Sequence, residues 1–206
     1  MCNRFGPALA GPGRELLDNQ QLSLDLEEIS RIRRDAPVMP HGWAPGITRA
    51  DSELRLGAFH WWLVPGWWRK SLSDLPGTFN ARAESLSSRP MFRGAWAAGK
   101  RCLIPAEYYL EGRKPSVKRI TRADGRPLLF AGLWDEWRSP EGEPLRSCTV
   151  ITCDPNPLIQ TIHSRMPVIL GPEEWNDWLD PQAPTEELQH LLRPCPDDWL
   201  RIESVG

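Results

Sequence analysis

The sequence predicts an α+β fold, in which one domain over residues 1–206 forms a curved, barrel-like mixed β-sheet with flanking helices. Apolar runs typical of strands dominate the middle of the chain, whereas helical patterns lie mainly near its ends. The 21 prolines favour short elements joined by rigid turns. A chain of 206 residues can bury one sizeable core, and no stretch is long enough to link two domains.

The first helix is predicted from its cap. Apolar residues from Leu16 to Ile32 have helical spacing, and Asp25 is a suitable N-cap for a helix that continues to about Arg34. Two glutamates follow the cap, where the helix dipole favours negative charge. Pro37 prevents the helix from continuing.

Apolar runs and turn residues define the other elements. The stretch Met39–Ile47 contains HGWAPG and is predicted to be a turn-rich loop. Strands are predicted at Leu54–Leu63, at Arg101–Pro105 continued by Glu107–Gly112, and at Leu128–Trp137, Arg146–Thr152 and Val168–Leu170. Helical segments are predicted at Met91–Ala98, at Asp154–Ile162, from Pro172, and at Thr185–Leu192.

Charge and composition exclude several classes of protein. The net charge of −2 and the pI of about 6.1 exclude a global field for polyanions, so any nucleic-acid site must be a local patch. Five cysteines and the lack of a secretory signal predict reduced thiols and a cytoplasmic location. A monomer is the default expectation. No apolar run is long enough to span a membrane. Cys148 and Cys153 lack a second ligand pair nearby, so we expect neither a metal nor a cofactor.

The second residue offers a specific chemistry. If the initiator methionine is removed, Cys2 carries a free α-amine beside its thiol. The amine condenses with aldehydes, and the thiol then closes a five-membered thiazolidine. The ordinary pKa values, near 8 and 8.5, leave both groups a usable nucleophilic fraction. The alternative is an incidental cysteine at a frayed terminus.

Tryptophans and polar donors indicate a binding surface. Side chains alternate along a strand, so the four indoles of the WWLVPGWW stretch, Trp61, Trp62, Trp67 and Trp68, cannot all point inward. Asn80 and Arg82 follow shortly after, with donors suited to phosphate. Indoles beside cations suit single-stranded nucleic acid. A solvated charged loop beside a core tryptophan cluster is the alternative.

Two residue types suit proton transfer. Glu111 ends an apolar strand, where burial favours the protonated carboxyl group, and Glu107 is an alternative four residues earlier. His163 lies where a loop enters a strand, and its intrinsic pKa suits acid/base work. A surface acid and a structural histidine are the corresponding alternatives.

The order of these motifs is more specific than any one of them. The series MCNRF, HGWAPG, WWLVPGWW, NARAE, RCLIPAEYYLEG, AGLW and IHSRMPVIL runs from residue 2 to about residue 170. It resembles the SOS-response-associated peptidase (SRAP) family of abasic-site processing, DNA–protein crosslinking proteins. The chain departs from the family pattern at Asn3, Gly42, Trp62 and Gly112, where Gly, Asn, Gly and Trp are usual.

The resemblance implies a set of site residues. The catalytic positions fall on Cys2, Asn80, Glu111 and His163, with Glu107 at the Asp of the glutamate motif. DNA-contacting positions fall on Arg4, Pro45, Trp67, Trp68, Arg82, Arg89 and Arg165.

It also implies a function. Mature Cys2 is expected to form a thiazolidine with the ring-opened abasic site of single-stranded DNA, and a peptidase-like step is expected to expose Cys2. A role in the SOS response, with nucleoid association on DNA, is part of this expectation. The competing hypotheses are a non-catalytic single-stranded DNA-binding protein and a cysteine peptidase that uses Cys2 and His163 on protein substrates.

Overall fold

The computed structural model describes residues 2–9, 22–50, 53–113 and 115–205. Its strands are β1 (Phe5–Pro7), β2 (Ser23–Leu24), β3 (Trp43–Ala50), β4 (Glu53–Trp61), β5 (Asn80–Arg82), β6 (Arg101–Glu111), β7 (Val117–Arg122), β8 (Leu128–Arg138), β9 (Pro144–Cys153), β10 (Met166–Pro167) and β11 (Leu200–Val205). Its α-helices are α2 (Leu26–Ile29), α3 (Pro90–Ala97), α4 (Pro157–Gln160) and α5 (Trp175–Leu179).

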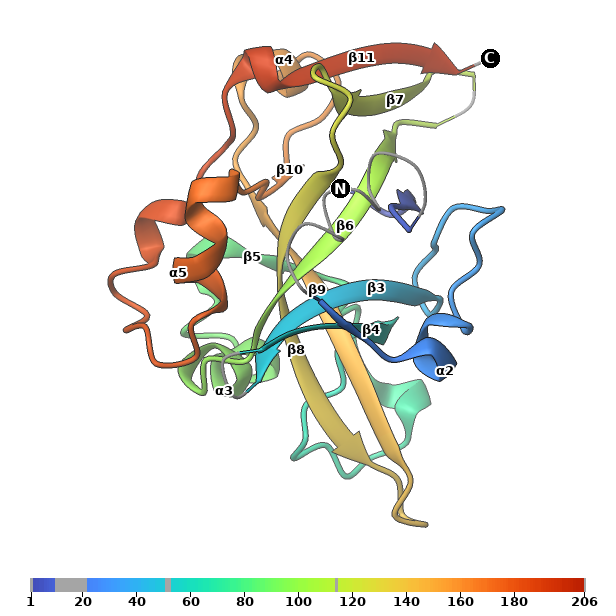
Figure 1. The fold of residues 1–206 in the computed structure, drawn as a ribbon, viewed down its shortest axis with the longest axis vertical. Helices are drawn as coiled ribbons and strands as arrows, with labels where there is room; N and C mark the ends of the chain where they lie inside the picture. Colours follow the sequence, from blue (N-terminus) through green and yellow to red (C-terminus); the bar gives the residue numbers. More distant parts are fainter. Residues whose placement is uncertain (1, 10–21, 51–52, 114, 206) are drawn as a thin grey trace.

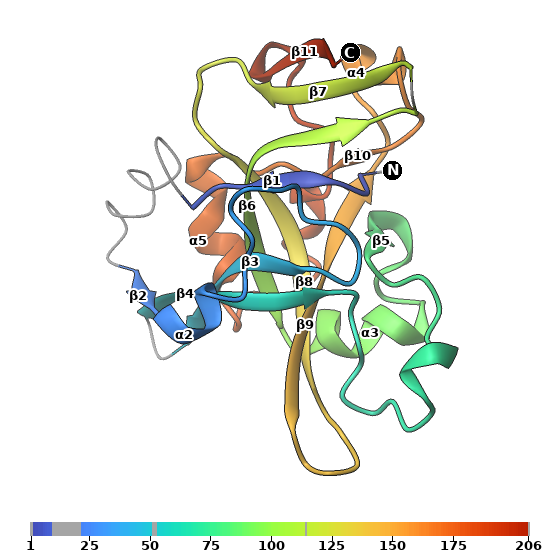
Figure 2. The same ribbon diagram turned by 90° about the vertical axis from the view of Figure 1, so that its right-hand side faces the viewer.

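A closed barrel forms the centre of the molecule. Strand β3 pairs with β4 and β6, β6 pairs with β8, β8 with β9, and β9 returns to β4 in parallel. Strand β5 joins β9 in parallel, and β7 with β11 extends the sheet from β6 above the barrel (Figures 1 and 2). The predicted α+β fold with a curved mixed sheet is therefore confirmed.

Aromatic side chains fix the start of the chain to the barrel. Phe5 is fully buried, and its ring centroid lies 4.9 Å from that of Trp61 and 5.8 Å from that of Phe130. Such edge-to-face pairs contribute about 0.5–1.5 kcal/mol each beyond their buried area. Strand β1 pairs antiparallel with β6, which places Phe5 opposite Tyr109. The chain thus joins the sheet three residues after Cys2.

The two predicted pieces of β6 form one strand. Pro105 lies within it, although proline cannot donate a ladder hydrogen bond. Its carbonyl accepts the N–H of Ala8, which comes from the segment directly after β1. The strand continues past the proline to Glu111 because β1, β7 and β8 all pair with it.

The prediction of a loop at Met39–Ile47 is wrong, because residues from Trp43 onward form β3. Gly46 suggested a turn, but it lies opposite Gly57 in the ladder. A Cβ at Gly46 would come within 2.5 Å of the Phe59 ring, so the glycine makes room for a core side chain. Glycine in this strand serves packing rather than a turn.

Several predicted elements differ in extent. Asp25 caps α2 by accepting the N–H of Glu28, but the helix ends at Ile29 instead of Arg34. Leu24 belongs to β2, and the part of the predicted apolar series at residues 16–21 lies outside the described residues. The predicted helix at Thr185–Leu192 is a series of turns with a 3-10 helix at Gln189–Leu191. The strand predicted at Val168–Leu170 is β10, two residues earlier.

Strands β7 and β11 were not predicted. They pair antiparallel over six residues each, from Val117 opposite Val205 to Arg122 opposite Leu200. The alternation of Leu200 and Ile202 with polar residues is a period-two signal that indicates β11. Arginines and a lysine interrupt the apolar pattern of β7 and conceal it.

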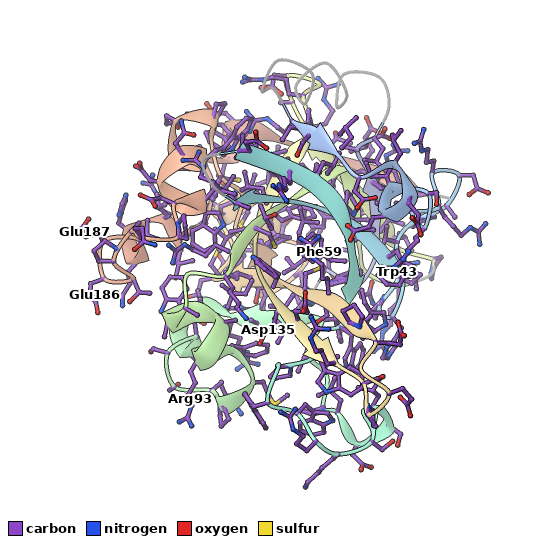
Figure 3. The ribbon with its side chains drawn as sticks, turned by 60° about the horizontal axis from the view of Figure 1, so that its bottom comes forward. Trp43, Phe59, Arg93, Asp135, Glu186 and Glu187 are labelled. Carbon is purple, nitrogen blue, oxygen red and sulfur yellow. The ribbon has the colours of Figure 1, made fainter. Side chains whose placement is uncertain are left out.

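Strands β8 and β9 form a hairpin whose far end extends below the barrel in Figure 1. Residues 62–79 connect β4 to β5 and pass beside this end of the hairpin in Figure 2. Asp135 on β8, labelled in Figure 3, ties the two together by accepting the N–H of Gly66 at 2.9 Å. Lys100 pairs with the same carboxylate at 2.6 Å.

Candidate active site

Cys2, the first described residue, is held in place by hydrogen bonds from two strands. Cys2 is fully buried, and its carbonyl accepts a 2.8 Å hydrogen bond from Asn80 Nδ2. Two residues later, the carbonyl of Arg4 accepts the N–H of Leu110 at 2.9 Å, and β1 begins. The position of Cys2 is therefore set by hydrogen bonds from β5 and β6.

Burial changes the chemistry expected of the thiol. Loss of hydration, and secondly the negative charge of Glu111, raise the pKa of the Cys2 thiol to about 12. The ordinary pKa assumed from sequence therefore does not apply in the folded chain. Near neutral pH the sulfur is a protonated thiol, so it needs a base when it reacts.

Glu111, whose charge acts on this thiol, lies next to His163. Glu111 ends β6 and is 6% exposed, and its Oε1 lies 3.8 Å from Nε2 of His163. The N–H of Arg165 donates to Nδ1 of His163 at 3.0 Å. Nδ1 also lies 3.1 Å from the carbonyl oxygen of Arg165, so the backbone of Arg165 positions the ring with Nε2 toward the glutamate. Glu107, the alternative, is exposed on β6.

The structure thus brings together four residues from distant parts of the chain. Asn80 contacts Cys2, the charge of Glu111 acts on the Cys2 thiol, and His163 faces Glu111. We call this set, Cys2, Asn80, Glu111 and His163, the floor of the site.

Arg165 is tied into the protein by ion pairs. Its guanidinium donates to both carboxylate oxygens of Glu84, at 2.6 and 3.0 Å, to Asp154 at 2.7 Å and to the carbonyl of Thr152 at 2.7 Å. These contacts fix the loop that carries His163, and the guanidinium charge is balanced by two carboxylates.

The other predicted DNA contacts divide into exposed and buried residues. Trp67 is 51% exposed, and Arg82 on β5 and Arg89 at the start of α3 are also exposed. We call these three the rim. Arg4 is half-buried and reaches the carbonyl of Gly112 at 3.4 Å. Two further predicted contacts, Pro45 in β3 and Trp68, are buried.

Sequence reasoning missed an aromatic stack near the site. His41 stacks on Trp62, with centroids 3.8 Å apart and an interplanar angle of 16°. Trp62 also packs on Phe79, which precedes Asn80. His41 has a φ of 69°, which is uncommon for a residue other than glycine. The HGWAPG motif contained His41, but its turn-like composition gave no sign of stacking.

Other kinds of site find no support in the described part of the chain. No group of three or more His, Cys, Asp or Glu residues there is arranged to hold a metal ion. The five cysteines, all described, are buried and free of disulfide bonds. Among the described helices, none has the length and apolar character needed to cross a membrane.

Comparison with known proteins decides the family. The pattern of the family described as SOS response associated peptidase (SRAP) matches residues 1–206. The chain belongs to this family. A solved structure from Bordetella bronchiseptica superposes with a TM-score of 0.86 at 29% identity and covers all of both chains.

Curated relatives in the SRAP family carry a functional name. The abasic site processing protein YoqW of Bacillus subtilis is 42% identical over 78% of this chain and 73% of its own length. The abasic site processing protein YedK of Escherichia coli is 29% identical over 93% of this chain and 85% of its own length.

Proposed function

We propose that this SRAP chain processes abasic sites in single-stranded DNA by forming a covalent thiazolidine between Cys2 and the damaged sugar. The observation that carries the proposal is the floor of the site, where Asn80 holds the Cys2 backbone and Glu111 faces His163. Membership of the SRAP family supports the abasic site as the substrate.

The reaction begins with exposure of the amine. Removal of Met1 gives Cys2 a free α-amine, and a peptidase-like step by the same residues is one route. Glu111 and His163 then move protons as the hemiacetal of the abasic sugar opens to its aldehyde. The amine adds to C1′ of the sugar, and loss of one water gives an imine.

The thiol completes the ring. Its S–H adds across the C=N bond, so a C–S bond forms at C1′ and a proton ends on nitrogen. Because burial keeps the thiol protonated, a base must take the proton as sulfur attacks. Glu111, whose charge already acts on this thiol, is the proposed base, and His163 facing it is the proposed relay.

Seven residues are proposed to shape the DNA interface. The rim supplies a stacking surface at Trp67 and phosphate contacts at Arg82 and Arg89. Pro45 and Trp68 are buried, Arg4 follows Cys2 by two residues, and the backbone N–H of Arg165 donates to His163. The interface is proposed to bind without a metal or cofactor.

The test uses two substitutions at one position. A single-stranded oligonucleotide with one abasic site is expected to give a heat- and SDS-stable adduct with the wild type. Cys2→Ala and Cys2→Ser both keep the α-amine, so borohydride is expected to trap an imine with either. Neither is expected to give the stable adduct, because alanine has no nucleophile and a serine hydroxyl closes a weaker ring.

The result also separates the competing functions. A stable adduct with Cys2→Ala would exclude the thiazolidine. Salt-sensitive binding with no covalent product would indicate a non-catalytic DNA-binding protein. Cleavage of peptides in the absence of DNA would indicate a cysteine peptidase.

A further inference from the structure

A second concave surface lies on the protruding hairpin. It is a cleft of about 700 Å³ between residues 68–72, with Gly66, and residues 136–140 at the end of β8 and the hairpin turn. We call it the hairpin cleft. Figure 3, in which the lower end of the molecule comes forward, shows this end of the hairpin next to the segment that precedes β5.

The base of the hairpin cleft is apolar and rigid. Trp68 and Trp137 are each 8% exposed and pack with Val64 and Leu75 in a small core separate from the barrel. The indole N–H of Trp137 donates to the carbonyl of Trp68 at 2.8 Å. The indole N–H of Trp68 donates to the carbonyl of Ser71 at 3.1 Å. These bonds fix both rings before any ligand arrives.

The edge of the hairpin cleft is cationic. Three basic side chains line it, Arg69, Lys70 and Arg138, against one carboxylate, Glu136. That carboxylate pairs with Arg138 at 2.9 Å, and Arg69 donates to the carbonyls of Gly66 and Trp68. The local charge is positive although the chain has a net charge of −2, so the cleft complements an anion.

The chain that lines the hairpin cleft starts and ends beside the floor of the active site. Trp61 Nε1 donates to the carbonyl of Phe79 at 2.8 Å and closes residues 62–78 into a loop. The next residue, Asn80, holds Cys2. Within the same loop, Trp67 is exposed and its ring centroid lies 5.9 Å from that of Trp68, which lines the cleft. Trp67 of the rim therefore lies next to the hairpin cleft.

We propose that the hairpin cleft is a second subsite for single-stranded DNA, which binds the phosphodiester backbone of nucleotides beyond the one that stacks on Trp67. The proposal rests on the proposed function and extends its substrate from a lesion to a stretch of strand. The apolar base of the hairpin cleft receives a sugar or a nucleobase, while Lys70 and Arg138 contact phosphate. The neighbouring Trp67 favours a nucleic acid over an acidic peptide.

The experiment varies the length of the DNA. Single-stranded oligonucleotides with one abasic site are extended nucleotide by nucleotide on the 5′ side in one series and on the 3′ side in the other. With wild-type protein, affinity is expected to rise in a step in one series only, at the length that reaches the cleft. Lys70→Glu is expected to abolish the step and weaken binding of the long oligonucleotide about three- to tenfold at low salt. Its crosslinking rate with the shortest oligonucleotide is expected to equal that of the wild type.

A matched charge reversal controls for net charge. Arg201→Glu changes the charge equally on β11, which lies at the opposite end of the molecule from the hairpin (Figure 1). It is expected to leave the step intact. Equal weakening of short and long oligonucleotides by Lys70→Glu would overturn the subsite, and so would a step that persists in this variant. Failure of the proposed function would instead appear as absence of a stable adduct at every length with wild-type protein.

Discussion

The floor of the site and its rim follow different physical rules. In the floor, Cys2 and Glu111 are buried, and a charge there changes the pKa of the neighbouring thiol. At the rim, Trp67, Arg82 and Arg89 are exposed to water and mobile ions. The contrast teaches that geometry and desolvation should govern the chemical step, while salt and stacking should govern affinity.

Glu111→Gln is expected to have the largest effect and to sharpen the contrast. The amide keeps the shape of the side chain but cannot accept a proton, so crosslinking at saturating DNA should slow about 10²–10³-fold. DNA affinity should change little. Time courses on denaturing gels measure the rate.

Glu107→Gln is the matched control, because Glu107 is exposed on the same strand. Its rate should stay near that of the wild type. If Glu107→Gln were the slower variant, the proton-transfer role would move to that residue and the floor would have to be redefined.

Trp67→Ala should act on affinity alone. Loss of base stacking costs about 1–3 kcal/mol per base, so Kd for single-stranded DNA should rise about tenfold. The crosslinking rate at saturation should remain unchanged, and Trp67→Phe should recover most of the affinity. An equal fall in the saturated rate would place Trp67 in the floor and break the contrast.

Arg82 and Arg165 test the border between the two regions. Arg82→Gln should lower the salt dependence of log K by about 0.7, the value for one phosphate contact on a single strand. Arg165→Gln should leave the slope nearly unchanged, because two carboxylates already balance its charge. It should instead slow crosslinking, because the ion pairs of Arg165 hold the loop that carries His163.

Arg165→Lys should crosslink as slowly as Arg165→Gln, because one ammonium group cannot reproduce the bidentate contact with Glu84. A fall in salt slope as large as that of Arg82→Gln would identify Arg165 as a phosphate contact.

Glu84→Gln should have the smallest effect, and the effect should depend on pH. The hydrogen bond from Arg165 holds the pKa of Glu84 below its usual value. A carboxyl group whose pKa is lowered by folding stabilises the fold at pH values above its pKa in the unfolded chain, roughly 4.3. This stabilisation is lost as the pH falls through its pKa in the folded chain. The free energy of unfolding of the wild type should therefore exceed that of the variant by about 0.2–1 kcal/mol near neutral pH. The difference should be smaller in acid. Urea unfolding at several pH values measures this, and a difference independent of pH would contradict it.

The order of motifs along the sequence predicted four residues, Cys2, Asn80, Glu111 and His163, that the structure brings together. It could not predict the state of Cys2, because the raised pKa of its thiol depends on burial by a closed barrel. Nor could it predict the charge balance at Arg165, because Glu84 lies 81 residues away in sequence. Local patterns cannot report contacts at that separation.

Much of the fold was predictable because its signals are local. Long apolar runs such as those of β8 and β9 contain their own signal. β3 was mistaken for a loop because it contains a glycine and a proline. Gly46 makes room for the Phe59 ring on the neighbouring strand, and Pro45 lies opposite Ala58. The errors lie where a residue serves a distant neighbour rather than its own segment.

The shortness of the connection between Cys2 and β1 has a consequence for the substrate. Only Asn3 and Arg4 separate Cys2 from the buried Phe5, so this end of the chain has almost no slack. In the proposed reaction, Cys2 cannot move far outward, so the abasic sugar must leave the base stack to reach it. Duplex DNA, with a persistence length of about 50 nm, resists such bending, while an unpaired strand yields readily. The short connection between Cys2 and β1 thus agrees with the proposed single-stranded substrate.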